Sequence, residues 1–421
     1  MRVDLPYGRG LLAVVVPDGA TVIRARHSDP LFDEHAAFLA ALREPEGSLP
    51  LRERVRRDDR VAIAISDGTR AVPNERIAPW ILEELSHVPR ERIVILVGTG
   101  SHRPNTPAEL ETMLGRSVLE RFEVVNHDAF DPAGLADVGQ APGGITVLVN
   151  ARWATATFRI ATGFIEPHFF AGFSGGPKAV VPGLAGISTI RPLHSARLVG
   201  DPNSTWAVRE KNPLHRAIRE CAALCPAHFL ANVTIDAARR VTGVYAGDPG
   251  PAHRAGCRAV EREAVFPVPA PFDVVISTNS GFPLDQNLYQ TVKGMTAAAE
   301  AVRDGGTILM VSECRDGLPA HGQYAKLLSR CKTPAEALAM VEAPGFESDD
   351  QWQVQKQALV QKKARVLLHS GLPEAAVRAA MLEPAPDLQA AIDRLAREAG
   401  PSARIAVMPD GPYVVPRVVP A

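Results

Sequence analysis

The sequence has few cysteines, no imbalance of charge and no long apolar run, and each of these features excludes a class of protein. Five cysteines in 421 residues make no disulfide framework, so a reducing compartment, the cytoplasm, is the expected location. Lys and Arg number 46 against 47 Asp and Glu, which argues against a dedicated nucleic-acid or membrane-surface binder. No stretch reaches the roughly 18–20 apolar residues that span a bilayer, and the N-terminus does not resemble a signal peptide.

The composition is that of a globular protein with a full core. Hydrophobic residues make up 46% of the chain and charged residues 22%. With about 150 residues per domain, the length predicts two or three domains. The 33 glycines and 36 prolines indicate many tight turns and short connections.

The first half of the chain alternates apolar runs with helical patterns, which is typical of βαβ units. The runs at 61–65, 93–97 and 145–149 are bounded by polar or turn residues and predict parallel strands buried on both faces. Residues 77–88 and 106–122 have apolar positions at helical spacing, the second with Thr106 and Glu109 as a capping box. The segment 230–248 predicts a β-hairpin.

A proline-rich break at 267–272 predicts a domain boundary, and a second βα series follows it. Strands are expected at 273–278 and 306–312, with helices at 284–305 and 386–400. The fold class is therefore α/β, with an N-terminal domain over 1–266 and a C-terminal α/β domain over 272–400. The segment 403–421 is predicted to be a strand and a turn, and the pattern leaves open whether it returns to the first domain.

Polar residues follow two of the predicted strands, where ligands gather in open α/β sheets. Asp67 and Arg70 come directly after 61–65, in a loop that suits an anion, or else a capped helix start with a surface arginine. His102 follows 93–97 in GTGSHR and is either a proton-transfer group or a structural loop histidine. A dinucleotide fingerprint fails there because Arg103 stands at the last glycine position.

The segment 163–186 is the most unusual part of the chain, because it is rich in glycine and holds a single lysine, Lys178. Desolvation in such a loop activates a lysine as a nucleophile, whereas exposure would make it an ordinary turn residue. The stretch GFSGG matches a nucleophile elbow around Ser174, so a serine hydrolase is one alternative. The context is poor, since an elbow needs a strand before the serine and a helix directly after it.

Two candidate metal sites are weak when judged by spacing alone. Residues 187–198 predict a helix on which Arg191 and His194 lie three positions apart, but no HExxH motif is present. Arg191 there either holds a second carboxylate, as in malate, or binds a phosphate or a surface acid. Cys221 and Cys225, with His228, are either metal ligands or buried packing residues.

Six segments of the chain together resemble a known family. They are SDGTR (66–70), GTGSHR (98–103), EPHFFAGFSGGPKAVVPG (166–183), TIRPLHS (189–195), YQTVKG (289–294) and DDQWQ (349–353). In this order and at these separations they resemble the nickel-dependent lactate racemases and related 2-hydroxy-acid racemases and epimerases. The long block at 166–183 is the most specific of them.

The resemblance implies a nickel pincer nucleotide, a pyridinium-3-thioamide-5-thiocarboxylic acid mononucleotide that holds nickel through two sulfurs and a ring carbon. It implies that Lys178 attaches this cofactor covalently and that His194 is the protein ligand to nickel. The residues that fall at acid/base positions are His102 and His168. The residues that fall at substrate-binding and further active-site positions are Arg70, Gln290, Lys293, Asp67, Tyr289 and Trp352. Leu193 departs from the asparagine common in relatives.

The implied enzyme is an isomerase that racemises or epimerises a lactate- or malate-like 2-hydroxy acid by reversible hydride transfer, through a 2-keto acid. Its two α/β domains, with mainly parallel sheets, are expected to surround a cleft, the first binding cofactor and the second contributing substrate-binding residues. Its expected partners are the small hydroxy acid and the cofactor-synthesis proteins, namely a carboxylase/hydrolase, a sulfur transferase and a nickel insertase. A non-catalytic relative that only binds cofactor or hydroxy acid is the remaining alternative.

Overall fold

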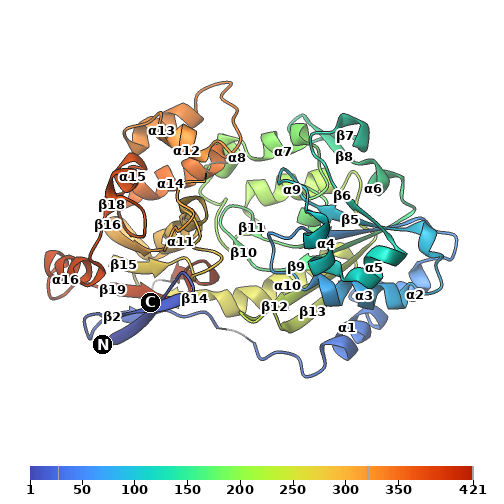
Figure 1. Ribbon diagram of the computed structural model, residues 1–421, viewed down its shortest axis with the longest axis horizontal. Helices are drawn as coiled ribbons and strands as arrows, with labels where there is room; N and C mark the ends of the chain where they lie inside the picture. The colour runs from blue at the N-terminus through green and yellow to red at the C-terminus, as the bar shows by residue number, and fades with distance from the viewer. Residues whose placement is uncertain (27, 320–321, 420–421) are drawn as a thin grey trace. The chain divides into compact units, whose positions relative to one another are not determined.

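The chain folds into two compact α/β units, each with its own six-stranded sheet (Figure 1). A computed structural model describes residues 1–26, 28–319 and 322–419. Among these, unit 1 comprises 1–26, 194–207 and 263–419, and unit 2 comprises 28–193 and 208–262. The chain therefore leaves unit 2 after Leu193, contributes a short excursion to unit 1, and re-enters unit 2 at Val208.

The sheet of unit 2 is parallel except at one edge. Its strands, in spatial order, are β13 (Val241–Gly247), β12 (Phe229–Ile235), β9 (Phe158–Phe164), β4 (Val61–Ser66), β5 (Ile93–Gly98) and β6 (Glu123–Asn126). The chain runs from β4 outward through β5 to β6, and then returns to the other side of β4 as β9. The carboxyl ends of β4 and β9 therefore flank a topological switch point, the place where open α/β sheets bind ligands.

One large apolar cluster of unit 2 packs residues of its helices against the sheet. Phe38 and Leu42, Ile77 and Ile81 pack against alternate strand residues such as Ile63. The helices of this unit are α1 (Glu34–Arg43), α2 (Leu51–Arg54), α3 (Asn74–Glu84), α4 (Pro107–Leu114), α5 (Arg116–Arg121), α6 (Ala151–Thr155), α7 (Ile187–Leu193), α9 (Pro213–Ala222) and α10 (Pro249–Ala264).

The sheet of unit 1 is parallel throughout. Its strands, in spatial order, are β18 (Glu383–Pro384), β17 (Arg365–His369), β16 (Val302–Val311), β15 (Phe272–Thr278), β19 (Ile405–Met408) and β3 (Thr21–Val22). The switch point lies between β15 and β19. Two further pairs belong to this unit, the hairpin of β1 (Arg2–Tyr7) with β2 (Gly10–Val15) and the parallel pair of β14 (Val265–Val268) with β20 (Val415–Val418).

The helices of unit 1 include one that is buried along most of its length, α14 (Gln351–Lys363). The others are α8 (Ala196–Val199), α11 (Leu288–Ala301), α12 (Tyr324–Leu328), α13 (Pro334–Val341), α15 (Glu374–Ala379) and α16 (Leu388–Ala399). Within the described ranges, no helix combines the length and apolar character needed to cross a membrane.

Most of the predicted elements are present, including the parallel strands at 61–65 and 93–97, the hairpin at 230–248 and the capping box of Thr106 with Glu109. The run at 145–149 is an exception, because β8 (Ile145–Asn150) pairs antiparallel with β7 (Leu135–Ala141) outside the main sheet. The helix expected at 106–122 is divided at Gly115, whose φ of 76° interrupts the helical path.

The units also divide the chain differently from the predicted sequential domains. The first 26 residues belong to unit 1 because Val3 and Leu5 pack into its core and β3 pairs with β19. The segment 403–421 stays with the second series, since β19 pairs with β15 and β20 with β14. Its last two residues lie outside the described ranges.

Candidate functional site

Two loops of unit 2 begin at the carboxyl ends of neighbouring strands and are joined by a carboxylate–imidazole pair. Asp67 follows the last residue of β4, and His102 follows β5 by four residues. The imidazole Nδ1 of His102 lies 2.8 Å from Oδ2 of Asp67. The structure thus brings together two residues that are 35 positions apart, because β4 and β5 are adjacent parallel strands.

The surroundings of Asp67 fix its role as the acceptor in this pair. Its side chain is buried, and the hydroxyl of Thr69 donates to its other oxygen over 2.8 Å. Since an ionised carboxylate only accepts hydrogen bonds, Nδ1 of His102 carries the proton. Nε2 of the neutral imidazole is then the basic nitrogen, on a side chain that is 48% exposed. This arrangement suits a general base.

The pKa of Asp67 is lowered although the group is buried. Burial raises it, but the hydrogen bond and charge of His102 together with Thr69 and Arg70 outweigh that effect. Asp67 is therefore ionised at neutral pH. Because its folded pKa is depressed, its contribution to stability is complete above about pH 4 and is lost as the pH falls through the folded pKa.

The glycine-rich segment, residues 163–186, begins at the carboxyl end of β9, on the other side of the switch point from Asp67. It contains the short strands β10 (Pro167–His168) and β11 (Gly172–Phe173), followed by the 3₁₀ helix η3 (Gly176–Ala179). His168 is buried, and its Nδ1 accepts backbone N–H groups from Phe170 at 3.5 Å and Ala171 at 3.2 Å. In the neutral ring the proton is therefore on Nε2, opposite to the arrangement in His102.

Lys178 lies in η3, and its side chain is half-buried. Its Nζ is 6.0 Å from the centre of the Phe170 ring, and Phe170 in turn packs edge-on against His168 with ring centres 4.5 Å apart. An aromatic neighbour and partial burial place the amine in a less hydrated environment than an open turn would. The segment therefore brings a histidine and a lysine to one aromatic cluster.

Four buried polar side chains hold the backbone of this segment from within unit 2. Asn212 Nδ2 donates to the carbonyl of Phe170 over 2.9 Å, and Asn232 Oδ1 accepts from the N–H of Gly176 over 2.8 Å. His215 Nδ1 donates to Ala171 O over 3.0 Å, and His253 Nε2 donates to Ser174 O over 2.9 Å. These hydrogen bonds fix the backbone of the segment just before Lys178.

Burial lowers the pKa of His215 to about 3 and that of His253 to about 4. Both rings are therefore neutral at physiological pH, as their hydrogen bonds to carbonyls require. Since their folded pKa values are depressed, the stability of the fold is expected to fall as the pH drops below the usual histidine pKa of about 6.5.

Gly172 is a position of the segment that tolerates no side chain. Its φ is 79°, and a Cβ atom there would lie 2.0 Å from the carbonyl oxygen of Val208. We expect Gly172→Ala to lower the free energy of unfolding by about 1–2 kcal/mol for the left-handed backbone, and by a further 1–3 kcal/mol for the overlap. Gly143→Ala is the control, because Gly143 has a φ of 84° and nothing within 4 Å of the added atom. Equal losses in urea unfolding would contradict this account.

Ser174, the candidate hydrolase nucleophile, is occupied by structural hydrogen bonds. Its hydroxyl donates to the carbonyl of Phe164 over 3.0 Å and accepts from the N–H of Glu166 over 2.9 Å. A two-residue strand precedes it and a four-residue 3₁₀ helix follows, so the strand–turn–helix geometry of a nucleophile elbow is absent there.

The predicted site residues of unit 1 gather around α11 and α14. Asn287 caps α11, which bears Tyr289, Gln290 and Lys293 on its first two turns. Trp352 Nε1, on α14, donates to the hydroxyl of Tyr289 over 3.2 Å. The ring of Trp352 also lies 4.6 Å from the ring of His194.

His194 lies in a break between two short helices, and the single helix expected at 187–198 is wrong. The helix α7 ends at Leu193, after Pro192, and α8 begins at Ala196. His194 is therefore the first residue of the excursion into unit 1, whereas Arg191 is exposed on α7 in unit 2.

The cysteine-based metal site is not supported. Cys221 and Cys225 are buried, and burial raises the pKa of Cys221 to about 11 and also raises that of Cys225, as expected for packing residues. His228 Nδ1 already accepts the N–H of Arg159. Within residues 1–26, 28–319 and 322–419, no group of three or more His, Cys, Asp or Glu side chains is placed to hold a metal ion.

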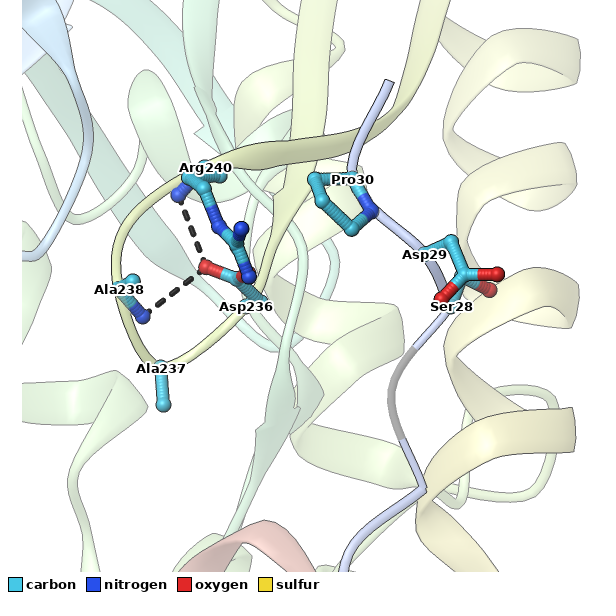
Figure 2. Close-up of a pocket in the computed structure, with 7 residues that line it drawn as sticks. All are labelled: Ser28, Asp29, Pro30, Asp236, Ala237, Ala238 and Arg240. Atoms are coloured by element: carbon cyan, nitrogen blue, oxygen red, sulfur yellow. Dashed lines mark hydrogen bonds and ion pairs between the residues drawn. The ribbon is translucent and has the colours of Figure 1, made fainter. Parts of the chain in front are cut away.

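Figure 2 shows a surface pocket at the β12–β13 turn, lined by none of the predicted site residues. Its volume is about 310 Å³, and the carboxylate of Asp236 accepts the N–H groups of Ala238 and Arg240 there, each over 2.9 Å. The carboxylate thus stabilises the hairpin turn.

Several polar residues that organise the two sets of predicted site residues were not anticipated from the sequence. Asn232, His215 and His253 stand singly within otherwise apolar or mixed patterns, which give no motif. The one available signal is the unusual QWQVQKQ pattern at 351–357, because four glutamines alternate along a stretch in which every residue except Trp352 is buried.

Comparison with protein families assigns most of the chain. Residues 7–207 match the lactate racemase N-terminal domain, and residues 268–416 match the lactate racemase C-terminal domain. The chain is 36% identical over 423 residues to the lactate racemase of Lactiplantibacillus plantarum and 33% identical over 425 residues to that of Thermoanaerobacterium thermosaccharolyticum. Each comparison covers 99% of both proteins.

Solved structures give a consistent result. The fold matches the lactate racemase apoprotein from Thermoanaerobacterium thermosaccharolyticum with a TM-score of 0.93 at 32% identity, over 99% of this chain and 100% of that one. A protein from Thermotoga maritima matches with a TM-score of 0.69 at 19% identity, over 93% and 99% of the two chains, which indicates a shared fold alone.

Proposed function

Because this chain belongs to the lactate racemase family and is therefore an isomerase, we propose that it interconverts the enantiomers of lactate. The observation that best supports proton transfer at its site is the 2.8 Å contact between Asp67 and His102. That contact orients an imidazole whose Nε2 is basic, at the carboxyl edge of the sheet. A malate-like or larger 2-hydroxy acid is the alternative substrate within the same reaction class.

The chemistry of a 2-hydroxy acid explains why a base alone is insufficient. The hydrogen on C2 is poorly acidic, because the adjacent carboxylate opposes a second negative charge. If that hydrogen leaves with its electron pair as hydride while a base takes the hydroxyl proton, the product is a flat 2-keto acid. Return of the hydride to the opposite face, with return of a proton to oxygen, gives the other enantiomer without net oxidation.

A hydride acceptor is needed, and we propose the nickel pincer nucleotide. The groups that the chain offers fit it: Lys178 has an amine for covalent attachment, and His194 has an imidazole, a donor that suits nickel. The absence of a three-ligand protein cluster among the described residues is compatible with a cofactor that brings its own metal ligands. When bound, this cofactor would accept the hydride and return it.

The chain's own residues then bind the substrate and move its proton. We assign the carboxylate and hydroxyl to Arg70, Gln290 and Lys293, which supply cationic and amide donors. Tyr289 and Trp352 shape the apolar side of the site, and their hydrogen bond fixes both rings. His102 accepts the hydroxyl proton at Nε2, and His168 is the second proton-transfer residue. The proteins that synthesise the cofactor are the proposed partners.

The direct test uses protein coexpressed with the cofactor-forming enzymes and a set of single enantiomers of 2-hydroxy acids. Lactate is expected to lose its optical rotation with loaded protein and to keep it with protein made without those enzymes. If malate or a larger acid loses rotation faster than lactate, the substrate assignment changes but the reaction class does not. If no 2-hydroxy acid loses rotation while the cofactor is bound, the chain is a non-catalytic binder.

Asp67→Asn is expected to lower kcat by roughly 100- to 10,000-fold, by analogy with the carboxylate of a catalytic triad. The amide would donate to Nδ1 of His102 and so favour the tautomer whose Nε2 is already protonated. Thr69→Val is the matched control, because it removes the other 2.8 Å bond to the same carboxylate and leaves the imidazole contact intact. A control loss as large as that of Asp67→Asn would contradict the tautomer argument. The measurement is the racemisation rate as a function of pH.

A further inference from the structure

The excursion of residues 194–207 is held on unit 1 by the side chains of one buried helix, α14. Gln351 Nε2 donates to the carbonyl of His194 over 3.3 Å, and Gln355 Nε2 donates to that of Ala196 over 2.9 Å. Lys356 Nζ donates to the carbonyl of Ser204 over 2.7 Å. All three side chains are buried. Water therefore cannot take the place of these hydrogen bonds if a substitution removes one of them.

These bonds compensate for the break between α7 and α8. The carbonyl of His194 lies just past the end of a helix, where carbonyls lose their partners within the helix, and Gln351 supplies one. Gly200 makes room for the second bond, because a Cβ atom there would lie 2.6 Å from Nε2 of Gln355. Trp352, between the two glutamines on the same helix, contacts the imidazole of His194 itself.

Helix α14 also makes a buried hydrogen bond from a glutamine to a carbonyl outside residues 194–207. Gln357, like Gln355, is completely buried, and its Nε2 donates to the carbonyl of Ala380 over 2.7 Å. That carbonyl lies outside the excursion. α14 therefore contains two classes of buried amide, one holding the segment that begins at His194 and one holding another part of unit 1.

We propose that Gln351, Gln355 and Lys356 are positioning residues, which fix the excursion so that the imidazole of His194 is held ready to bind a metal. This inference rests on the proposed function, in which His194 is the protein ligand to nickel. A metal ligand must be oriented by its supporting contacts, and loss of such a contact typically weakens metal binding by about 10- to 100-fold. A merely structural role would lower stability without a selective effect on nickel.

The test compares Gln355→Met and Lys356→Met with the control Gln357→Met. Each variant removes one buried bond to a carbonyl, and the control also removes the bond that Gln357 Oε1 accepts from the hydroxyl of Tyr324. In cofactor-free protein, hydrogen exchange of peptides covering 194–207 is expected to be faster in the first two variants and unchanged in the control. In cofactor-loaded protein, nickel loss to excess EDTA is expected to be about 10- to 100-fold faster in the first two. The control should lose nickel at the wild-type rate, even with a similar fall in Tm.

The inference is overturned if Gln355→Met and Gln357→Met lose nickel equally, or if Gln355→Met loosens 194–207 while nickel loss stays at the wild-type rate. Should Gln355→Met fail to fold, Gln351→Met removes the longest of the three bonds at the first turn of α14 and keeps the same expectation. Failure of the proposed function is distinguished by His194→Ala, which keeps α14 intact. If that variant retains nickel as wild type does, His194 is not the ligand.

Discussion

Lys178→Ala is expected to abolish both the attachment of the cofactor and racemisation. Lys178 is the lysine of the glycine-rich segment, and no other side chain there can form a covalent bond through an amine. Protein coexpressed with the cofactor-forming enzymes should carry the mass of the nucleotide on the peptide that contains Lys178. Intact-protein and peptide mass spectrometry measure the adduct, and optical rotation measures the loss of activity.

Two controls separate attachment from charge. Lys178→Arg keeps a cation near Phe170 but has no amine to attach the cofactor, so it should behave like the alanine variant. Lys211→Ala removes an exposed lysine of the same unit and should leave adduct and activity unchanged. An adduct on a different lysine in wild-type protein, or full activity in Lys178→Arg, would show that the attachment site is wrong.

Local patterns predict most elements of the fold, because residues that become buried are apolar and their spacing follows the helix or strand period. The runs at 61–65 and 93–97 are apolar throughout because both faces of their strands are covered. The run at 145–149 has the same composition, yet its strand pairs antiparallel with β7, outside the main sheet. Composition reports burial but does not report which strand is the neighbour.

Strand patterns alone predict the proximity of candidate site residues only where these residues come directly after adjacent strands. Asp67 and His102 come after adjacent strands, so a prediction of parallel pairing already brings them near each other. The bonds of Gln351 and Gln355 could not be predicted, because their partners His194 and Ala196 lie 157 and 159 residues away. The same separation explains why the sequence does not reveal that residues 194–207 belong to unit 1, since no local pattern marks a segment that joins another unit and then returns.

His102 and His168 are expected to have unequal effects when each is replaced. If hydride leaves toward one face and the carboxylate stays held, the two enantiomers present their hydroxyls on different sides, and one base does not reach both. His102 holds its basic nitrogen at Nε2, because Nδ1 donates to Asp67. Nδ1 of His168 accepts the N–H of Ala171, so its Nε2 carries the proton in the neutral ring. When both rings are neutral, His102 is therefore the one whose Nε2 can accept a proton without a change of tautomer.

Both His102→Ala and His168→Ala should lose racemisation, with a bell-shaped pH profile in the wild-type enzyme, because each group must accept and return a proton. The half-reactions should differ. In a single turnover with each pure enantiomer, His168→Ala should form keto acid from the enantiomer served by His102, and at the faster rate of the two variants. His102→Ala should form it from the other enantiomer, and more slowly, since His168 must first change tautomer. If both variants preferred the same enantiomer, or if either racemised at nearly the wild-type rate, the assignment of two bases would be wrong.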